Sequence, residues 1–318
     1  MTNGRIAVVG SGAIGSYYGG KLAAAGRDVH FLMRGDLADV RRHGLRLVGP
    51  DEDVRIEKVQ CSNTTEEIGP CDLVLIAVKT ISNSALSALL PPLLHEGTLL
   101  LTLQNGLGNE ELLAGHFGAE RVLGGLCFIC LTRISPTRIE RADDGHVALG
   151  EFNRPALSRT HEVAALFTDA GVRCDVVDHL ALERWRKLVW NIPFNGLSVI
   201  AGEIDTAAIL RDAELRGVTL AVMAEVIEAA KRCGYPLESS TAAEQIQRTE
   251  TMGAYQPSTL LDFQAGRPLE IEAIWGEPLR RARVAGAATP RLQLLYAALK
   301  SLDEAVRGKA AARTELNA

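Results

Sequence analysis

The chain has 318 residues, a length that corresponds to about two domains of ordinary size. Hydrophobic residues make up 47% and charged residues 23%, as in globular proteins with a buried core. The net charge of −5 argues against a basic nucleic-acid-binding face, and no apolar run reaches the roughly 18–20 residues that a membrane span needs. No signal-peptide pattern precedes the first expected strand, so we expect a cytoplasmic protein with neither nucleic acid nor membrane as a partner.

The first half of the chain alternates short β-branched or Leu-rich runs with longer helix-like stretches. The expected strands are Arg5–Val9, Val29–Met33, Leu73–Val78, Thr98–Leu103 and Arg121–Leu131, and the expected helices are Ala13–Ala25, Ser82–Leu90 and Glu110–His116. This alternation predicts an α/β domain with a doubly wound, mostly parallel sheet. We also expect an inserted hairpin of Leu45–Val48 with Val54–Val59, and a second short pair of Ile139–Arg141 with His146–Leu149.

From His179 onward the pattern is nearly all helical. The expected helices are Leu180–Ser198, Arg211–Cys233, Ser239–Met252, Ser258–Gln264, Glu270–Val284 and Arg291–Arg307. The sequence therefore predicts a Rossmann domain at 1–178 and an all-helical domain at 179–318, with ligands bound in a cleft between them. The helical half is equally compatible with a monomer and with a homodimer.

The six cysteines offer little chemistry. Only Cys127 and Cys130 form a Cys-x-x-Cys pair, and no second pair has the spacing of a zinc site, so we expect no metal. The pair lies in the apolar stretch 125–131, which favours buried thiols in a strand over a redox role.

A glycine motif follows the first expected strand. It comprises Gly10, Ser11, Gly12, Ala13, Ile14 and Gly15, with a helix directly after it. In a strand–turn–helix context this Gly-x-Gly-x-x-Gly pattern indicates a dinucleotide site, where the diphosphate meets the N–H groups at the helix N-terminus.

Charged and amide side chains lie where the next strands end. Arg34 stands at the tip of the second strand, where NAD-binding proteins usually carry an acidic residue, and it suits the 2′-phosphate of NADP. The alternative is a solvated Arg34 with Asp36 binding the ribose. Lys79 and Asn105 follow the next two expected strands, and either could be no more than a surface lysine or a turn asparagine.

Lys187, Asn191 and Asn195 are spaced i, i+4 and i+8 in an otherwise largely apolar helix. On an α-helix they form one polar stripe about 12 Å long. Such side chains need buried polar partners or a ligand, and the alternative is a solvated stripe on a surface helix.

Taken together, these motifs resemble the ketopantoate reductase (2-dehydropantoate 2-reductase) family, over nearly the whole chain. The likeness rests on Gly10–Gly15, Gln104-Asn105-Gly106, the Lys187/Asn191/Asn195 series, and Ser258 to Glu270 with Asp262, Gly266 and Arg267 between them. Such enzymes reduce the 2-keto group of ketopantoate to pantoate with NADPH, in pantothenate biosynthesis. The resemblance thus implies a small 2-keto acid as substrate.

The resemblance also implies roles for the site residues. Lys187 would protonate the developing alkoxide, and Glu270 would hold a hydroxyl of the substrate or the cofactor. Asn105 would contact both substrate and nicotinamide. The remaining residues fall into two sets: Asn191, Asn195 and Ser258 would bind the substrate, whereas Arg34 and Lys79 would bind the adenosine end of NADPH. A ketone that receives a hydride builds negative charge on oxygen, so a cation that can release a proton suits this step.

Three positions depart from the family pattern on the substrate side. Tyr255 and Asp205 stand where substrate-binding asparagines are expected, and Pro193 precedes Asn195, whereas the proline more often follows that asparagine. Two alternatives therefore stay open: an NADP-dependent 2-hydroxyacid dehydrogenase for another 2-keto acid, and a non-catalytic NADPH-binding regulator. The regulator predicts loss of Lys187 and Glu270, and both are present.

Overall fold

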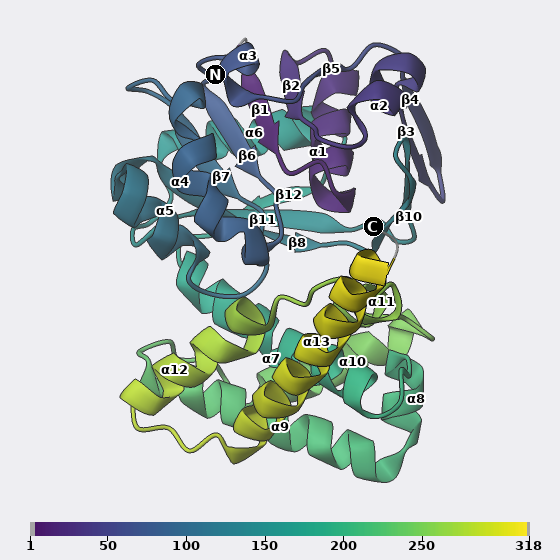
Figure 1. Cartoon of the computed structure of the whole chain (residues 1–318). Helices are drawn as coiled ribbons and strands as arrows, with labels where there is room; N and C mark the ends of the chain where they lie inside the picture. Colours follow the sequence, from purple (N-terminus) through teal and green to yellow (C-terminus); the bar gives the residue numbers. More distant parts are fainter. Residues whose placement is uncertain (1–3, 317–318) are drawn as a thin grey trace. The chain divides into compact units, whose positions relative to one another are not determined.

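The computed structural model describes residues 4–316, with side chains through residue 305 and at 307. The chain forms two compact units (Figure 1). The N-terminal unit is Met1–Gln104 with Asn109–Leu180, and the C-terminal unit is Asn105–Gly108 with Ala181–Ala318. The backbone therefore passes from one unit to the other three times.

An eight-stranded sheet organises the N-terminal unit. Its strands are β1 (Ile6–Val9), β2 (Val29–Leu32), β5 (Gln60–Ser62), β6 (Leu73–Ile76), β7 (Leu99–Thr102), β8 (Val122–Phe128), β11 (His146–Glu151) and β12 (Cys174–Val176). The spatial order is β12-β11-β8-β7-β6-β1-β2-β5; the strands from β8 to β5 are parallel, whereas β11 pairs antiparallel with β8 and parallel with β12. The strands from β5 to β8 have the order 3-2-1-4-5-6 of dinucleotide-binding domains, so the predicted mostly parallel, doubly wound sheet is confirmed.

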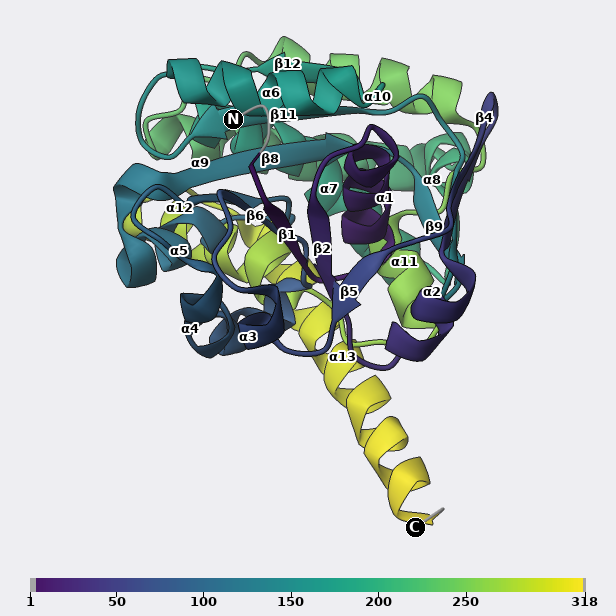
Figure 2. The ribbon, with the colours of Figure 1, turned by 90° about the horizontal axis from the view of Figure 1, so that it is seen from above.

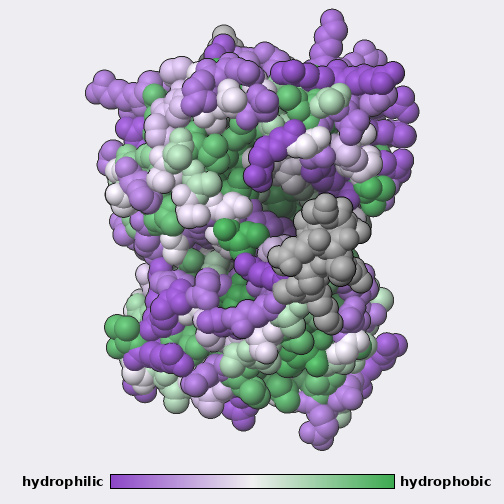
Figure 3. All heavy atoms as spheres, viewed as in Figure 1, coloured by the Kyte–Doolittle hydropathy of each residue, from purple (hydrophilic) through white to green (hydrophobic). Residues whose placement is uncertain are grey.

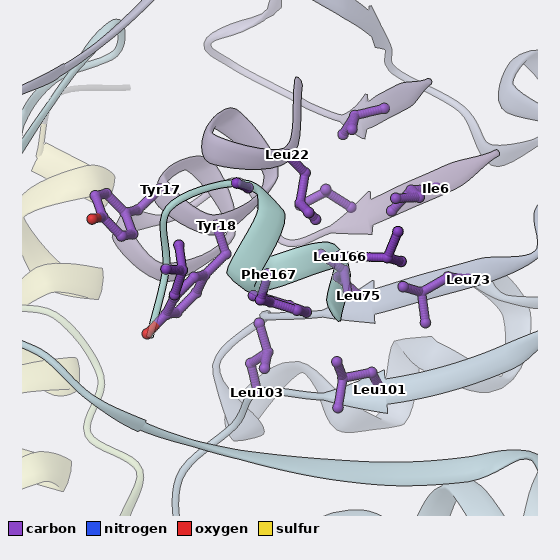
Figure 4. Packing of buried hydrophobic residues seen from close by; sticks show 14 of the residues in the cluster. Ile6, Tyr17, Tyr18, Leu22, Leu73, Leu75, Leu101, Leu103, Leu166 and Phe167 are labelled. Atoms are coloured by element: carbon purple, nitrogen blue, oxygen red, sulfur yellow. The ribbon is translucent and has the colours of Figure 1, made fainter. Parts of the chain in front are cut away.

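Alternating side chains bury both faces of this sheet. Ile6 and Leu75 point to the face that is covered by α1 (Ala13–Ala24) and α6 (Ser158–Asp169), as Figure 4 shows. The residues that alternate with these along each strand lie on the opposite face of the sheet. They pack against the helices α3 (Thr65–Ile68), α4 (Leu86–Leu89) and α5 (Asn109–Phe117). Each fully buried aliphatic side chain contributes about 1.5–3 kcal/mol, so burial on both faces strongly stabilises these central strands.

A small second sheet extends the N-terminal unit. Its strands are β3 (Leu45–Gly49), β4 (Glu52–Ile56), β9 (Leu131–Ser135) and β10 (Arg138–Arg141), in the order β4-β3-β10-β9, and α2 (Leu37–His43) precedes β3. The predicted β3–β4 hairpin is confirmed. The predicted pairing of the strands that became β10 and β11 is wrong, because β10 adds to β3 whereas β11 pairs with β8 in the large sheet.

Other local predictions also need correction. The expected strand through Leu131 ends at Phe128, because Leu131 already belongs to β9 in the small sheet; between the two strands the N–H of Cys130 donates to Asp143 Oδ1 at 2.9 Å. Cys127 is buried in β8, and Cys130 is half-buried outside the strand. The expected helix at 82–90 consists of a 3₁₀ turn, η1 (Thr80–Ala85), and the single turn α4.

A charged cluster ties the small sheet to α1. Lys21 Nζ lies 2.7 Å from Glu52 Oε2, while Tyr17 Oη and Arg141 Nε donate to Glu52 Oε1 at 3.1 and 3.2 Å. Burial alone would raise the pKa of the Glu52 carboxyl, but these donors outweigh burial and hold that pKa below its ordinary value. The ionised carboxylate thus joins β4, β10 and α1.

The C-terminal unit is helical, as predicted. Its elements are α7 (Leu180–Ile200), α8 (Thr206–Arg211), α9 (Ala213–Arg232), α10 (Ser240–Met252), α11 (Ser258–Gln264), the π-helical turn η4 (Glu272–Gly276), α12 (Glu277–Val284) and α13 (Pro290–Leu316). The fully buried side chains of Trp185, Phe194 and Trp275 lie in its core. The stretch expected as one helix at 270–284 begins with the π turn.

Both hydrophilic and hydrophobic residues lie on the surface. In Figure 3 hydrophilic residues cover most of the visible face, with hydrophobic ones in scattered patches. None of the described helices has the length and apolarity that crossing a membrane requires.

Candidate functional site

The glycine loop between β1 and α1 packs against the end of β6. Gly10 has φ of +106°, and a Cβ at this position would clash with the backbone N of Val78, so only glycine fits. A Cβ at Gly15 would clash with the carbonyl oxygen of Gly10, because α1 approaches the turn closely. At Gly12, in contrast, a Cβ would meet nothing within 4 Å. The loop is thus tight toward the sheet and open in front of Gly12.

The first turn of α1 carries a partial positive charge that no side chain offsets. Its N-cap is Gly12, which has no side chain to cap the N–H groups of Ala13, Ile14 and the residues after them, and the turn contains no acidic residue. Ser11 fixes the loop by donating from Oγ to the carbonyl oxygen of Leu32 at 2.8 Å. This arrangement can accept a phosphate group.

The predicted specificity cation is exposed. Arg34 lies two residues beyond β2, and none of the described carboxylates forms an ion pair with it. The competing residue Asp36 instead pairs with Arg133, at 2.8 Å. Lys79 is half-buried and directly follows Val78, which contacts the glycine loop. The structure therefore leaves Arg34 available to an anion and engages Asp36 elsewhere.

An amide network joins the ends of β6 and β7. The Nε2 of Gln104 donates to the Val78 carbonyl at 2.8 Å and to Asn83 Oδ1 at 2.7 Å. The Oγ1 of Thr102 donates to Gln104 Oε1 at 3.0 Å, and Asn83 Nδ2 donates to Asn109 Oδ1 at 3.0 Å. Because Gln104 immediately precedes Asn105, this network fixes the start of the loop that carries Asn105.

The loop Asn105–Gly108 is part of the C-terminal unit and packs on η4. Gly106 has φ of +85°, and a Cβ there would clash with the carbonyl oxygen of Ala273. The same oxygen accepts the N–H of Leu107 at 2.9 Å. The glycine of the Gln-Asn-Gly motif is thus required by close backbone contact with a π turn, an element that often occurs at functional sites.

Lys187 and Asn105 meet directly. The Nζ of Lys187, on the half-buried side of α7, donates to Asn105 Oδ1 at 2.8 Å. One turn further along the same helix Asn191 is 6% exposed, and after another turn Asn195 is 2% exposed. The two asparagines are therefore buried and Lys187 is half-buried, so the interpretation of the stripe as a solvated face is wrong.

Asn195 and Ser258 also come together. Asn195 Oδ1 accepts the N–H of Thr259 at 3.1 Å and the hydroxyl of Ser258 at 3.5 Å. The N-cap of α11 is Pro257, whose side chain cannot cap the helix, so Asn195 supplies the missing acceptor from α7. This contact positions Ser258 relative to the stripe.

The two unusual positions of the substrate side are linked. Asp205 caps α8 by accepting the N–H of Ala208 at 2.7 Å. The N–H of Thr206, the residue directly after Asp205, donates to the Tyr255 carbonyl at 2.9 Å. The Tyr255 ring lies 6.1 Å from that of Trp190, which neighbours Asn191. Asp205 therefore has a clear structural role, and Tyr255 adds an aromatic ring beside α7.

The turn after α11 is held by its own side chains. Arg267 Nε donates to Asp262 Oδ1 at 2.9 Å, and Gly266 has φ of +63°. Glu270 follows this turn, half-buried, and its carbonyl accepts the N–H of Ile274 at 3.2 Å. The turn thus places Glu270 just before η4, the element on which the Asn105 loop packs.

Several contributing residues were missed by the sequence analysis. Asn83, Asn109, Ala273, Trp275 and Arg133 take part in these contacts. Trp275 donates from Nε1 to the Ile192 carbonyl at 3.1 Å and so joins η4 to α7. No local pattern indicates them, since each acts on a partner far away in sequence. In the part of the chain that the structure describes, no group of His, Cys, Asp or Glu could hold a metal ion.

Comparison with known proteins identifies the family. The model of "Ketopantoate reductase PanE/ApbA" matches residues 6–154, and that of "Ketopantoate reductase PanE/ApbA C terminal" matches residues 179–303. The chain belongs to the ketopantoate reductase family. It is therefore an oxidoreductase, as the motifs predict.

Individual known proteins match over nearly the whole chain. A 2-dehydropantoate 2-reductase from Nostoc sp. is 37% identical over 308 residues, which are 95% of this chain and 96% of that protein. The crystal structure of 2-dehydropantoate 2-reductase from Geobacter metallireducens superposes with a TM-score of 0.90 at 43% identity, covering 94% and 99% of the two chains. D-mandelate dehydrogenase with NADH and anilino(oxo)acetate shares the fold, with a TM-score of 0.87 at 21% identity over 95% and 99%.

Proposed function

We propose that this member of the ketopantoate reductase family reduces 2-dehydropantoate to pantoate with NADPH, in pantothenate biosynthesis. The observation that carries the proposal is the 2.8 Å hydrogen bond between Lys187 Nζ and Asn105 Oδ1. It holds the amine that we propose as the proton donor at a defined point on the polar stripe of α7. The substrate is suggested by what the related reductases are named for.

The cofactor residues are those of the N-terminal unit. The loop Gly10–Gly15 would hold the diphosphate at the N-terminus of α1, Arg34 the 2′-phosphate, and Lys79 the rest of the adenosine end. The open space at Gly12 and the exposed guanidinium of Arg34 fit this assignment. When bound, NADPH supplies the hydride that the keto carbon receives.

The residues of the C-terminal unit would carry the proton and orient the substrate. Lys187 would donate a proton from Nζ to the keto oxygen as negative charge develops there. Asn105 would keep the amine in place and contact the substrate, and Glu270 would accept a hydrogen bond from a hydroxyl of the substrate or the cofactor. Asn191, with the amide N–H groups of Asn195 and the hydroxyl of Ser258, would bind the polar ends of the substrate.

A substrate panel tests this function. NADPH oxidation would be followed with ketopantoate, 2-ketoisovalerate, pyruvate and phenylglyoxylate. We expect the highest kcat/KM with ketopantoate. A value about tenfold higher with another 2-keto acid would reject ketopantoate as the substrate, and activity with none of them would reject the reductase.

A second candidate is an NADP-dependent dehydrogenase for aromatic 2-keto acids. The Tyr255 ring beside Trp190 favours it, because an apolar wall at a position expected to hold asparagine suits an aromatic substrate better than a hydroxylated one. Under this alternative phenylglyoxylate should be the best substrate, and Tyr255→Asn should shift the preference toward ketopantoate.

A further inference from the structure

A long-range ion pair involves Asp36, which is two residues after the proposed specificity cation Arg34. Arg133 Nη2, on β9, donates to Asp36 Oδ2 at 2.8 Å and to the Pro136 carbonyl at 3.0 Å. The side chains of Arg133 and Asp36 are 24% and 35% exposed. A pair with this exposure stabilises the fold by no more than about 1 kcal/mol, so its contribution to folding is small.

The side chain of Asp36 forms this ion pair and does not cap the helix that follows it. It is the N-cap residue of α2, yet its side chain makes no capping hydrogen bond. Aspartate is among the best N-cap residues, and such a cap is worth about 1 kcal/mol. The carboxylate is instead directed toward a guanidinium 97 residues away in sequence.

Both partners originate at one edge of the large sheet. Asp36 follows the carboxyl end of β2, and the segment that becomes β9 follows the carboxyl end of β8. The strands from β2 to β8 in the sheet order are parallel, so these ends share one edge, which is where doubly wound sheets bind cofactors. Figure 2 shows β9 and α2 on the same side of the N-terminal unit.

We propose that Arg133 is a positioning residue for cofactor choice: it neutralises Asp36, two residues beyond Arg34, so that no carboxylate opposes the 2′-phosphate of NADPH. An acidic side chain near this strand tip is the feature that favours the free ribose 2′-hydroxyl of NADH. The inference rests on the proposed use of NADPH. It attributes part of the preference for NADPH over NADH to Arg133 of the small sheet, which lies far in sequence from the glycine motif.

The first test is Arg133→Met, which removes the charge and keeps much of the side-chain volume. Dissociation constants for NADPH and NADH would be measured by equilibrium titration of the whole chain. We expect the preference for NADPH over NADH to fall about tenfold, with weaker NADPH binding and unchanged or tighter NADH binding. Equal loss of both cofactors would overturn the proposal, because it would indicate general damage.

The second test separates charge neutralisation from direct contact. In the double variant Arg133→Met with Asp36→Asn, no unpaired carboxylate remains, so the preference should return to near the wild-type value. Arg133→Lys, which keeps a cation, should also preserve it. Failure of Asp36→Asn to restore the preference would show that Arg133 acts in another way, and would overturn the proposal.

A matched control and the wild type complete the design. Arg138→Met removes a guanidinium of the same small sheet that pairs with Glu140, and it should leave the cofactor ratio unchanged. The melting temperature of each variant reports on folding. If the wild type prefers NADH, the proposed cofactor itself fails; if it prefers NADPH and Arg133→Met does not alter the ratio, only the present inference fails.

Discussion

The amine of Lys187 is held by a neutral oxygen, that of Asn105, at 2.8 Å. An amide oxygen orients an ammonium group without cancelling its charge, so the cation can still stabilise a developing oxyanion. The spacing of Lys187 with two asparagines on an apolar helix was enough to predict a buried polar stripe. The capping role of Asn195 could not be predicted, because its partner lies 64 residues away.

Lys187→Met tests the proposed proton donor. General acid catalysis contributes about 10²–10⁴-fold, so kcat should fall by that factor while the dissociation constant of NADPH changes little. Steady-state kinetics and NADPH titration give the two values. Lys300→Met, which removes an exposed lysine of the C-terminal unit, is the control. Near-normal turnover of the Lys187 variant would remove the assigned role.

Arg34→Ala tests the proposed specificity cation. Loss of a guanidinium from a phosphate site should weaken NADPH binding at least about tenfold and leave NADH binding nearly unchanged. Titration with each cofactor measures the effect, with Arg42→Ala, an exposed arginine of α2, as the control. An equal change for both cofactors would argue against contact with the 2′-phosphate.

Among the elements, those with strong local patterns agree best with the sequence. Strands buried on both faces were predicted from short continuous apolar runs, and long amphipathic helices from their 3.6-residue periodicity. The π turn η4 and the short strands β5 and β12 were not, because a π turn has no periodic signal and a three-residue strand is defined by its neighbours. The expected strand Ile139–Arg141, which is part of β10, was paired with the wrong partner because its true partner β3 is far away in sequence.

Gly106→Ala tests the contact between the Asn105 loop and η4. The positive φ and the clash with the Ala273 carbonyl should destabilise the protein by about 1–3 kcal/mol and lower kcat by displacing Asn105. Denaturant unfolding and kinetics measure both effects. Gly217→Ala in α9, where a Cβ meets nothing within 4 Å, is the control and should be neutral or stabilising. Wild-type behaviour of the Gly106 variant would show that the loop can relax.

Glu52→Gln tests the cluster that joins α1 to the small sheet. The pKa of Glu52 is lowered in the folded protein, so its contribution to stability is present above the unfolded-state pKa and is lost as the pH falls through the folded-state value. The variant should therefore melt a few °C lower than the wild type near pH 7, and the difference should shrink toward pH 4 and below. Melting curves across this range give the result, with Glu140→Gln as the control. A constant difference would exclude the titration of Glu52 as the cause.

At the scale of the whole chain, two separate hydrophobic cores support the two units. One set of clusters surrounds the large sheet, and another lies among the helices from α7 to α13. The change from alternating to helical patterning near residue 179 reflects this division. No sequence pattern indicated that the tetrapeptide Asn105–Gly108 belongs to the helical unit. Its place there depends on the hydrogen bond between the Leu107 N–H and the Ala273 carbonyl, which are 166 positions apart.

NADPH should stabilise the protein in proportion to its affinity. At a concentration 100 times the dissociation constant, a ligand that binds only the folded state adds about 2.7 kcal/mol. Calorimetry with and without NADPH should show a higher melting temperature for the wild type and for Lys187→Met, and a smaller rise for Arg34→Ala. An equal rise in all three would mean that Arg34 contributes nothing to affinity.

The three passages of the backbone between the units limit how this enzyme can be recombined. A chimera spliced once, at residue 180, would supply the helices of one parent with a tetrapeptide from the other. The backbones of Gly106 and Ala273 would then come from different parent proteins. These backbones are so close that a Cβ at position 106 has no room. Functional hybrids should therefore require that Asn105–Gly108 be exchanged together with the helices.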